Sequence, residues 1–246
     1  MNRQSIGYVS GITQYPVKSL AGNELEKAVI TPYGLYGDRS HAFVDETKEG
    51  WNQYITAREV PMMLGLHVVF QDGEERSGTE EEFPPLQITG HEGQTFGWNE
   101  ELLAYLQPHS RRTMALKRYK PTDELLGVDA RCLLIITDRT LARLEQMLGK
   151  PLDSRRFRAN LLVRLSDDYA GDEYGWIGKQ LQIGATRLEV VEPCDRCSLI
   201  TLDPDTYARD VSILKKVNEE MGLNFGVYAQ IAEKGVIGID DPIYPL

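Results

Sequence analysis

The sequence predicts a mainly β fold of the α+β kind, with two β-barrel-like halves and a few helices. Short apolar segments recur at close spacing with Gly and Pro between them, which is typical of a barrel or sandwich rather than of βαβ units. Helical periodicity is clear in two places, both in the second half of the chain. With 246 residues, the chain can form one large domain or two smaller ones.

The first half is predicted to consist of strands joined by tight turns. Residues 6–13 form the first strand, which ends or reaches a sheet edge near Pro16 because proline cannot donate to a strand ladder. Residues 71–85 are rich in Asp, Glu, Gly and Ser and indicate a solvated loop. Further extended segments are expected at residues 28–30, 41–44, 54–58 and 64–70.

The second half is predicted to hold both clear helices among further strands. Apolar residues repeat at helical spacing from 141 to 148, where Asp138 is expected to cap the helix and Gly149 to end it. The other helix covers residues 211–221 and ends before Gly222. A basic, loop-like segment at 108–121 marks the boundary between the halves. Strands are expected at residues 133–137, 161–165, 181–183, 188–191, 225–231 and 236–239.

Composition argues against several classes of protein. A net charge of −10 argues against general binding to nucleic acid or to anionic membranes. Three cysteines are too few, and odd in number, for a disulfide framework. The first residues lack the apolar core of a signal peptide, and no apolar run approaches the roughly 20 residues of a spanning helix. We therefore expect a cytoplasmic protein that binds neither nucleic acid nor membrane.

The motif Cys194-Asp195-Arg196-Cys197 is the most informative stretch of the sequence. An apolar run precedes it, and the turn sequence Asp203-Pro204-Asp205-Thr206 follows a few residues later. The two thiols are therefore expected at the mouth of a strand. A neighbouring arginine favours the thiolate form, which attacks electrophiles or binds metals.

Several interpretations compete for this motif. A structural zinc site needs two more ligands at matching spacing, but no second Cys-x-x-Cys is present and the four histidines are scattered. A thioredoxin-like dithiol normally opens a helix, whereas β-prone residues follow Cys197. A third interpretation is a single thiolate on a soft metal, with Arg196 as the neighbour that holds an anion. On this motif alone, the third interpretation and a turn with two ordinary cysteines both stay open.

Basic residues near turns indicate an anion-binding pocket in this acidic chain. Arginine binds phosphate in a bidentate manner, and lysine supplies a point charge. Any one of these side chains can equally be solvated, but together with a metal thiolate they suit a phosphorylated, metal-bearing cofactor. The candidates are Lys18 with Ser19, Asp38-Arg39, Thr56 with Arg58, and Arg155-Arg156-Phe157-Arg158-Ala159-Asn160.

Five motifs occur in the order found in MOSC proteins, a family named for the C-terminal domain of molybdenum cofactor sulfurases. The chain resembles, over nearly its whole length, members with an N-terminal MOSC β-barrel such as the mitochondrial amidoxime-reducing component. Each motif alone is weak, whereas five in order are specific. They are Tyr15-Pro16-Val17-Lys18-Ser19, Thr56-Ala57-Arg58-Glu59, Phe157-Arg158-Ala159-Asn160, Arg196-Cys197 and Asp203-Pro204-Asp205-Thr206.

The resemblance implies a molybdenum–molybdopterin cofactor (Moco) held between two halves. These are a MOSC N-terminal β-barrel domain at residues 1–112 and a MOSC domain at residues 113–246. Cys197 matches the position whose thiolate ligates molybdenum, which makes it the implied metal ligand and catalytic residue, whereas Cys194 has no such role. The implied cofactor-binding residues are Lys18, Ser19, Arg39, Thr56, Arg58, Arg158, Asn160 and Arg196.

Three positions depart from the family pattern. Ala159 replaces the usual proline, Glu59 stands where the reductases usually carry glutamine, and Asp240-Asp241 stands in place of Gly-Asp. The arginine and asparagine on either side of Ala159 are nevertheless retained. We therefore expect a looser cofactor loop that keeps its arginine and asparagine, and a turn of different geometry at Asp240-Asp241.

The resemblance further implies a molybdenum-dependent oxidoreductase that reduces small N-hydroxylated or N-oxygenated compounds by oxygen transfer. Electrons are expected from a separate flavin or iron–sulfur protein, because three cysteines cannot hold a four-cysteine cluster and no Gly-x-Gly-x-x-Gly motif is present. The alternative is a sulfur carrier with a persulfide on Cys197, or a cofactor-binding module without turnover. A persulfide carrier has little need of the phosphate-binding residues around Lys18 and Arg158.

Overall fold

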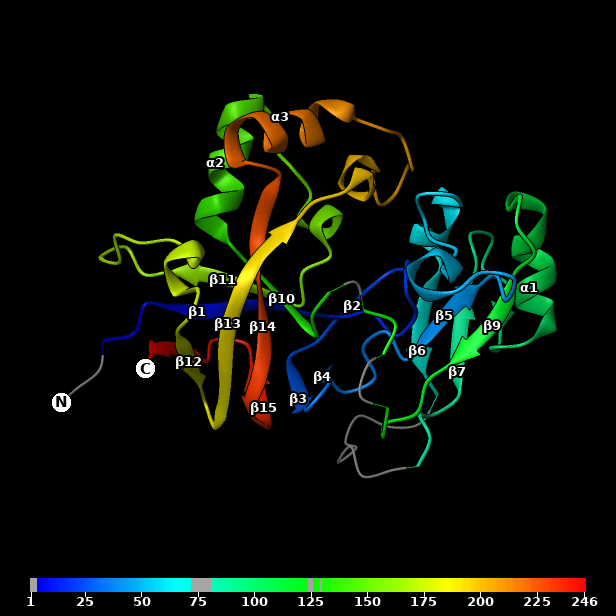
Figure 1. Cartoon of the computed structure of the whole chain (residues 1–246), viewed down its shortest axis with the longest axis horizontal. Helices are drawn as coiled ribbons and strands as arrows, with labels where there is room; N and C mark the ends of the chain where they lie inside the picture. Colours follow the sequence, from blue (N-terminus) through cyan, green and yellow to red (C-terminus); the bar gives the residue numbers. More distant parts are fainter. Residues whose placement is uncertain (1–3, 72–80, 124–125, 129) are drawn as a thin grey trace.

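The structure of the protein is a computed structural model that describes residues 4–71, 81–123, 126–128 and 130–246. Within these ranges the fold is mainly β, with sixteen strands, three α-helices and several short 3-10 helices. Figure 1 shows two lobes, with a barrel and two helices on one side and smaller sheets on the other. The mainly β class predicted from the sequence is confirmed.

Seven strands close into a barrel. Their order is β11-β10-β14-β13-β12-β16-β1, and β1 pairs back to β11, which completes the ring. Neighbouring strands are antiparallel except β10 and β11. These strands are β1 (Gly7–Gln14), β10 (Leu133–Thr137), β11 (Leu161–Leu165), β12 (Gln180–Ile183), β13 (Thr186–Asp195), β14 (Asn224–Glu233) and β16 (Pro242–Pro245).

Alternating apolar residues fill the barrel. Val9 and Ile12 of β1 are buried together with Leu161 and Val163 of β11, although the two strands lie about 150 residues apart in the chain. Burial alternates along β11, as in a strand with one face on a core, whereas in β1 a bulge between Val9 and Gly11 brings Ile12 to the same face as Val9. The barrel therefore depends on a strand from the beginning of the chain.

Two helices cover the barrel as the sequence predicts. Both α2 (Asp138–Leu148) and α3 (Val211–Met221) end at a glycine in the left-handed conformation, Gly149 and Gly222. The N-cap of α2 is Thr137 rather than Asp138, because the Thr137 hydroxyl accepts from the backbone N–H of Thr140. Asp138 instead accepts from the backbone N–H of Leu165 in β11 and ties the helix to the barrel.

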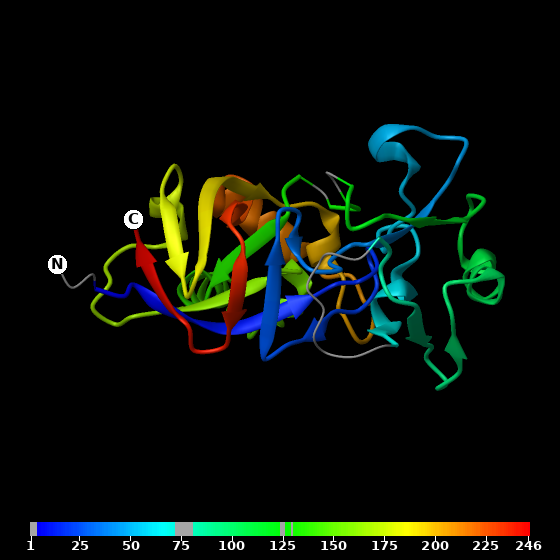
Figure 2. The same ribbon diagram turned by 90° about the horizontal axis from the view of Figure 1, so that it is seen from below.

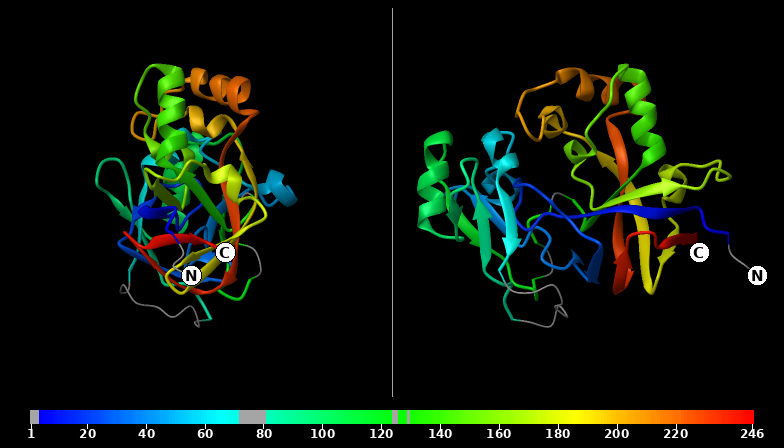
Figure 3. Two further views of the ribbon diagram at one scale, coloured as in Figure 1. Left: turned by 90° about the vertical axis from the view of Figure 1, so that its left-hand side faces the viewer. Right: turned by 180° about the vertical axis from the view of Figure 1, so that it is seen from behind.

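The remaining strands form three small sheets (Figures 2 and 3). Two lie in the second lobe, whereas the sheet that contains residues 27–31 and 235–238 packs on the barrel core through Ile30, Leu35 and Ile237. The sheets are β3 (Lys27–Thr31) with β4 (Gly34–Leu35) and β15 (Gly235–Gly238), β5 (His41–Val44) with β9 (Ala115–Arg118), and β6 (His67–Phe70) with β7 (Leu86–Thr89) and β8 (Thr95–Phe96). The two-residue strand β2 (Asn23–Glu24) extends β1, and α1 (Glu100–Leu106) packs against the lobe through Leu102 and Leu106.

Several segments of the first half differ from the prediction. The strand expected at 64–70 begins only at His67, because Pro61 opens a 3-10 helix, Pro61–Gly65. Only Tyr54 of the segment 54–58 pairs with a strand, and the chain turns after Thr56. The segment 108–121 contains β9 rather than only loop. Of the predicted loop at 71–85, residues 72–80 lie outside the described residues.

The chain crosses between the two lobes more than once. β1 and β3 pack in the barrel core, β5 to β9 belong to the second lobe, and β10 returns to the barrel. The division at residues 112 and 113 stays a prediction. In the described part of the chain, no helix has the length and apolar character needed to span a bilayer. The expected cytoplasmic location also stays a prediction.

Candidate functional site

One cleft gathers side chains from both lobes. It holds about 760 Å³ of atom-free space, part of which is open solvent. The nine residues to which the family resemblance assigns a site role all line it: Lys18, Ser19, Arg39, Thr56, Arg58, Arg158, Asn160, Arg196 and Cys197. The structure thus brings the predicted residues together, and their binding roles stay predictions. The other lining residues are Val128, Arg131, Leu134, Phe157, Cys194, Asp195, Leu199 and Tyr228.

Lys18 enters the cleft from the turn that follows β1. Its side chain is only 6% exposed, and its Nζ donates to the backbone oxygen of Gly127 at 2.9 Å. The same ammonium lies 4.3 Å from the ring centroid of Trp51 and 4.9 Å from that of Tyr54. Aromatic faces attract a cation, so these rings stabilise the buried charge.

Arg39 and Arg158 meet across the cleft. The guanidinium of Arg39 pairs with the buried carboxylate of Asp38, and its Nη2 donates to the backbone oxygen of Arg158 at 3.2 Å. Arg158 follows the 3-10 helix Ser154–Phe157 and donates from Nη1 to the backbone oxygen of Leu20 at 2.8 Å. Each arginine therefore connects the barrel with the first half of the chain.

Three of the cleft residues have a strained backbone. Ser19, Arg39 and Arg158 have φ values of +72°, +52° and +53°, and they are half of the non-glycine residues with positive φ that the described chain contains. This conformation costs about 1 kcal/mol or more for each such residue and concentrates at functional sites. The surrounding contacts evidently hold these three residues in place.

Asn160 uses its side chain to join the lobes. Its Oδ1 accepts from the backbone N–H of Leu134, while its Nδ2 donates to the backbone oxygen of Thr13 and to Asp38, each at 3.1 Å. With the residue only 2% exposed, both amide hydrogens have protein acceptors. In this geometry Asn160 supports the cleft wall and positions its neighbours.

Thr56 and Arg58 form one edge of the cleft. The Thr56 hydroxyl accepts from Nε of Arg58 at 3.3 Å, and the backbone oxygen of Arg58 accepts from Arg209 at 2.9 Å. Arg209 belongs to the segment after the second cysteine, so this bond ties the two lobes together. The nearby Glu59 does not enter the cleft, because its carboxylate pairs with Arg112.

The two cysteines of the motif differ sharply. Cys194 lies in β13 and is 1% exposed, whereas Cys197 is exposed and precedes the 3-10 helix Ser198–Thr201. Arg196 lies beside the buried thiol, with its Nη1 2.9 Å from Sγ of Cys194. Its Nη2 donates to the backbone oxygen of Phe157, and its Nε is buried without a partner in the described residues. Sequence spacing alone did not reveal that the arginine contacts the first cysteine.

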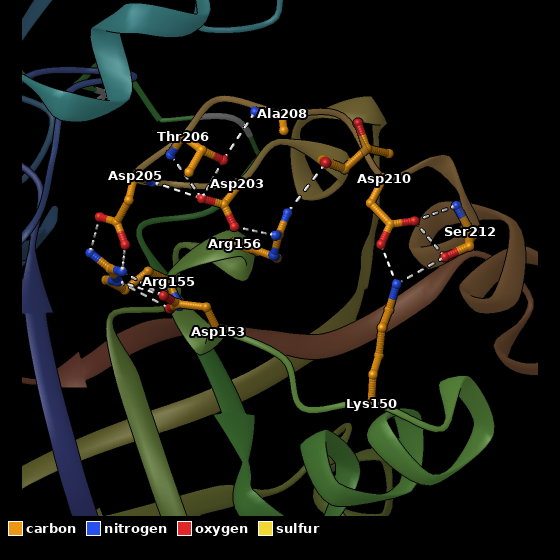
Figure 4. A network of polar contacts seen from close by, with 11 residues as sticks. Lys150, Asp153, Arg155, Arg156, Asp203, Asp205, Thr206, Ala208, Asp210 and Ser212 are labelled. Carbon is orange, nitrogen blue, oxygen red and sulfur yellow. Dashed lines mark hydrogen bonds and ion pairs between the residues drawn. The ribbon is translucent and has the colours of Figure 1, made fainter.

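Two arginines of the candidate run do not reach the cleft. Figure 4 shows Arg155 paired with Asp153 and Asp205, and Arg156 paired with Asp203. The acidic residues of the motif at 203–206 therefore hold the arginines at 155 and 156 in a separate network. Within the run, Arg158 and Asn160 are the polar side chains that line the cleft.

Sequence reasoning missed several lining residues. Arg131 pairs with Glu192 at 2.7 Å, and Tyr228 of β14 lies opposite Leu134 of β10. No motif marks these residues, because Tyr228 reaches the cleft through the pairing of β14 with β10, and Arg131 precedes β10 outside any recognisable pattern. Among the described residues, no cluster of three or more His, Cys, Asp or Glu side chains is arranged to hold a metal ion.

Comparison with known proteins places this arrangement in a family. The family model described as MOSC domain matches residues 122–244, and the model of the MOSC N-terminal beta barrel domain matches residues 6–96. The chain belongs to the MOSC family. The fold and the cleft of this MOSC protein can therefore be compared with those of its relatives.

The curated relatives extend over almost the whole MOSC protein. Mitochondrial amidoxime-reducing component 1 from Homo sapiens is 26% identical over 99% of this chain and 84% of its own length. Molybdenum cofactor sulfurase from Homo sapiens is 23% identical over 89% of this chain and 29% of its own length. The YUAD protein from Bacillus subtilis, a solved structure, has a TM-score of 0.50 at 12% identity and covers 97% of this chain and 94% of its own, a likeness of fold alone.

Proposed function

We propose that this MOSC protein binds Moco in the cleft and works as a molybdenum-dependent oxidoreductase of small N-hydroxylated or N-oxygenated compounds. One observation carries the proposal. A single cleft contains the exposed Cys197 thiol together with the basic residues of both lobes. The similarity to amidoxime-reducing components supports the reaction class. A separate flavin or iron–sulfur protein would supply the electrons.

The chemistry of the cleft fits a phosphorylated cofactor. Of the described residues that line it, six are cationic and one, Asp195, is acidic. Arg196 is only 8% exposed, and its Nε is a buried donor without a partner in the described chain. A buried unmatched donor costs free energy, and an anionic ligand would satisfy it. The cationic residues are Lys18, Arg39, Arg58, Arg131, Arg158 and Arg196.

The thiol chemistry fits a metal that brings most of its own ligands. Cys197 offers one soft sulfur at the cleft, and no cluster of ligating side chains surrounds it in the described residues. A molybdopterin would supply further sulfur ligands. When bound, such a cofactor supplies the redox chemistry of oxygen transfer, while the protein binds and orients it. In this proposal Cys197 ligates the metal, and the arginines neutralise the phosphate.

The proposal is tested with protein purified from a host that makes the cofactor. We expect about one molybdenum and one pterin per chain, and turnover of a hydroxylamine with reduced viologen as the electron source. Cys197→Ser should abolish turnover because a hydroxyl is a poor ligand for a soft metal. Cys194→Ser serves as the matched control and should retain bound molybdenum.

The outcomes separate the proposed oxidoreductase from its alternative. Molybdenum-loaded protein that gives no turnover with reduced viologen would point to a cofactor-binding module or another substrate class. Protein that carries a persulfide on Cys197, and no molybdenum, would point to a sulfur carrier. Turnover with NADPH and no added protein would contradict the expected separate electron donor.

A further inference from the structure

Tyr15 lies directly behind the two arginines that meet across the cleft. The guanidinium carbon of Arg39 is 4.5 Å from the Tyr15 ring centroid, and that of Arg158 is 4.1 Å from it. The tyrosine is 3% exposed and does not line the cleft itself. One aromatic ring thus contacts two cations that belong to different lobes.

The Tyr15 ring has a fixed position. Its backbone N–H donates to Oδ1 of Asp38 at 2.7 Å, and its backbone oxygen accepts from the N–H of Arg39 at 2.6 Å. The hydroxyl donates to the backbone oxygen of Ala159 at 3.4 Å. Gly22 packs on the ring edge so closely that a Cβ there would lie 2.5 Å from Cε1. The chain therefore encloses the ring on several sides.

The same contacts explain how two like charges can share one small region. The negatively polarised face of an aromatic ring attracts a guanidinium. The buried carboxylate of Asp38 pairs with Arg39. Burial also raises the pKa of Tyr15, so its hydroxyl stays neutral at physiological pH. Because Tyr15 makes its contacts with both arginines, loss of the ring removes a shared support from each lobe.

We propose that Tyr15 is a positioning residue that holds Arg39 and Arg158 as a pair for one phosphate-type anion. The two guanidiniums lie against the same ring, and both line the cleft. Bidentate binding of a phosphate depends on the orientation of the arginine fork and on its charge. The identity of the natural anion rests on the proposed function. The positioning role itself concerns any ligand with a phosphate group.

Titration of the full-length chain with inorganic pyrophosphate tests this role. The protein comes from a host that cannot make the cofactor, and binding is measured by calorimetry. We expect Tyr15→Leu to weaken binding about tenfold or more, because two ring contacts with arginines are lost. Tyr15→Phe keeps the ring and should bind within about threefold of wild type. Rescue by phenylalanine separates a role of the ring from a role of the hydroxyl.

Two further variants control for a general loss of structure. Tyr33→Leu removes another buried tyrosine ring, which packs against Phe83 away from the cleft, and should destabilise the chain without changing pyrophosphate affinity. Gly22→Ala would place a Cβ 2.5 Å from Cε1 of Tyr15 and 2.5 Å from Cγ2 of Thr13, so it displaces the ring or the neighbouring end of β1 and should weaken binding even if Tyr15→Leu fails to fold. Thermal unfolding of each variant reports its fold.

The outcomes distinguish this inference from the proposed function. Equal affinities for wild type, Tyr15→Leu and Gly22→Ala would overturn the positioning role, as would a wild-type chain that binds no pyrophosphate. The proposed function survives both results if the chain still loads molybdenum and pterin in a cofactor-producing host. Conversely, the expected pattern of affinities in a chain that never loads molybdenum would overturn only the proposed function.

Discussion

The two lobes hold their cleft residues in different ways. In the barrel, Arg196 and Cys197 follow the ten-residue strand β13, which pairs with β12 and β14. In the first half, Lys18, Ser19 and Arg39 lie in turns between short strands, and side-chain contacts fix their positions. A continuous ladder spreads its stability over many backbone bonds. A turn held by a few polar side chains is more sensitive to the loss of any one of them.

Asp38 offers the largest test of this difference. Its buried carboxylate accepts from the backbone N–H of Tyr15 and from Asn160, and it pairs with Arg39. Asp38→Ala would leave these donors unmatched and should lower the free energy of unfolding by about 3 to 5 kcal/mol, the usual cost of breaking a buried charged pair. Chemical denaturation followed by fluorescence measures this change.

A half-buried carboxylate in the turn between β15 and β16 provides a contrast to Asp38. Asp241 accepts one hydrogen bond, from the backbone N–H of Gly238 at 2.7 Å. Its replacement by alanine should cost only about 1 kcal/mol. Similar losses for the two variants would contradict the idea that the first half depends on a few polar side chains. Two separate transitions in Asp38→Ala would instead show that the carboxylate couples the lobes.

Buried titratable groups also differ between the lobes. His41 of β5 is fully buried, and burial together with the charge of Arg118 lowers its pKa to about 3. Glu173 is buried against the barrel, where burial raises its pKa despite bonds from the hydroxyls of Thr137 and Thr140. Lowering the pH therefore reduces the contribution of His41 to the stability of the fold. Glu173 has the opposite pH dependence, because a buried carboxylate destabilises the fold more as rising pH favours its ionised form.

Acid should destabilise the first half through His41. The unfolded histidine binds a proton below about pH 6.5, whereas the folded one stays neutral down to about pH 3. Its contribution is thus complete above pH 6.5 and is lost as pH falls towards 3, with a loss of about 2 kcal/mol by pH 5. Urea unfolding of wild type and His41→Gln at pH 7.5 and pH 5 measures it. An equal loss in both proteins would exclude His41 as the cause.

The sequence allowed more of the site to be predicted than of the contacts that hold it. Helices α2 and α3 followed from regular apolar spacing and terminal glycines, whereas the seven-residue α1 has too few turns for that pattern, although Asn99 before Glu100 was a usable cap signal. Strand β9 contains Lys117 and Arg118 and lacks an apolar run. Pairing of β1 with β11 depends on folding of the whole chain.

Within the site, motifs identified which residues gather but not how they contact one another. Arg155 and Arg158 look alike in the sequence, yet one lies in an exposed ion-pair network and the other lines the cleft. Arg196 stands between two cysteines, and only the structure shows it against Cys194. The contacts of Arg158 depend on its left-handed backbone, and those of Arg196 depend on the direction of β13. Residue identities alone specify neither.

The smallest expected change in stability comes from Arg155, and Arg158 provides the direct comparison. Arg155 and its partners Asp153 and Asp205 are substantially exposed, so solvent screens their attraction. Arg155→Ala should lower the free energy of unfolding by less than about 1 kcal/mol and leave pyrophosphate affinity unchanged. Arg158→Ala should weaken pyrophosphate binding about tenfold or more, because it removes a charge-assisted fork from the cleft. Calorimetry and denaturation on both variants measure this contrast. Weakened binding in Arg155→Ala would mean that the network in Figure 4 supports the cleft and is not an independent surface feature.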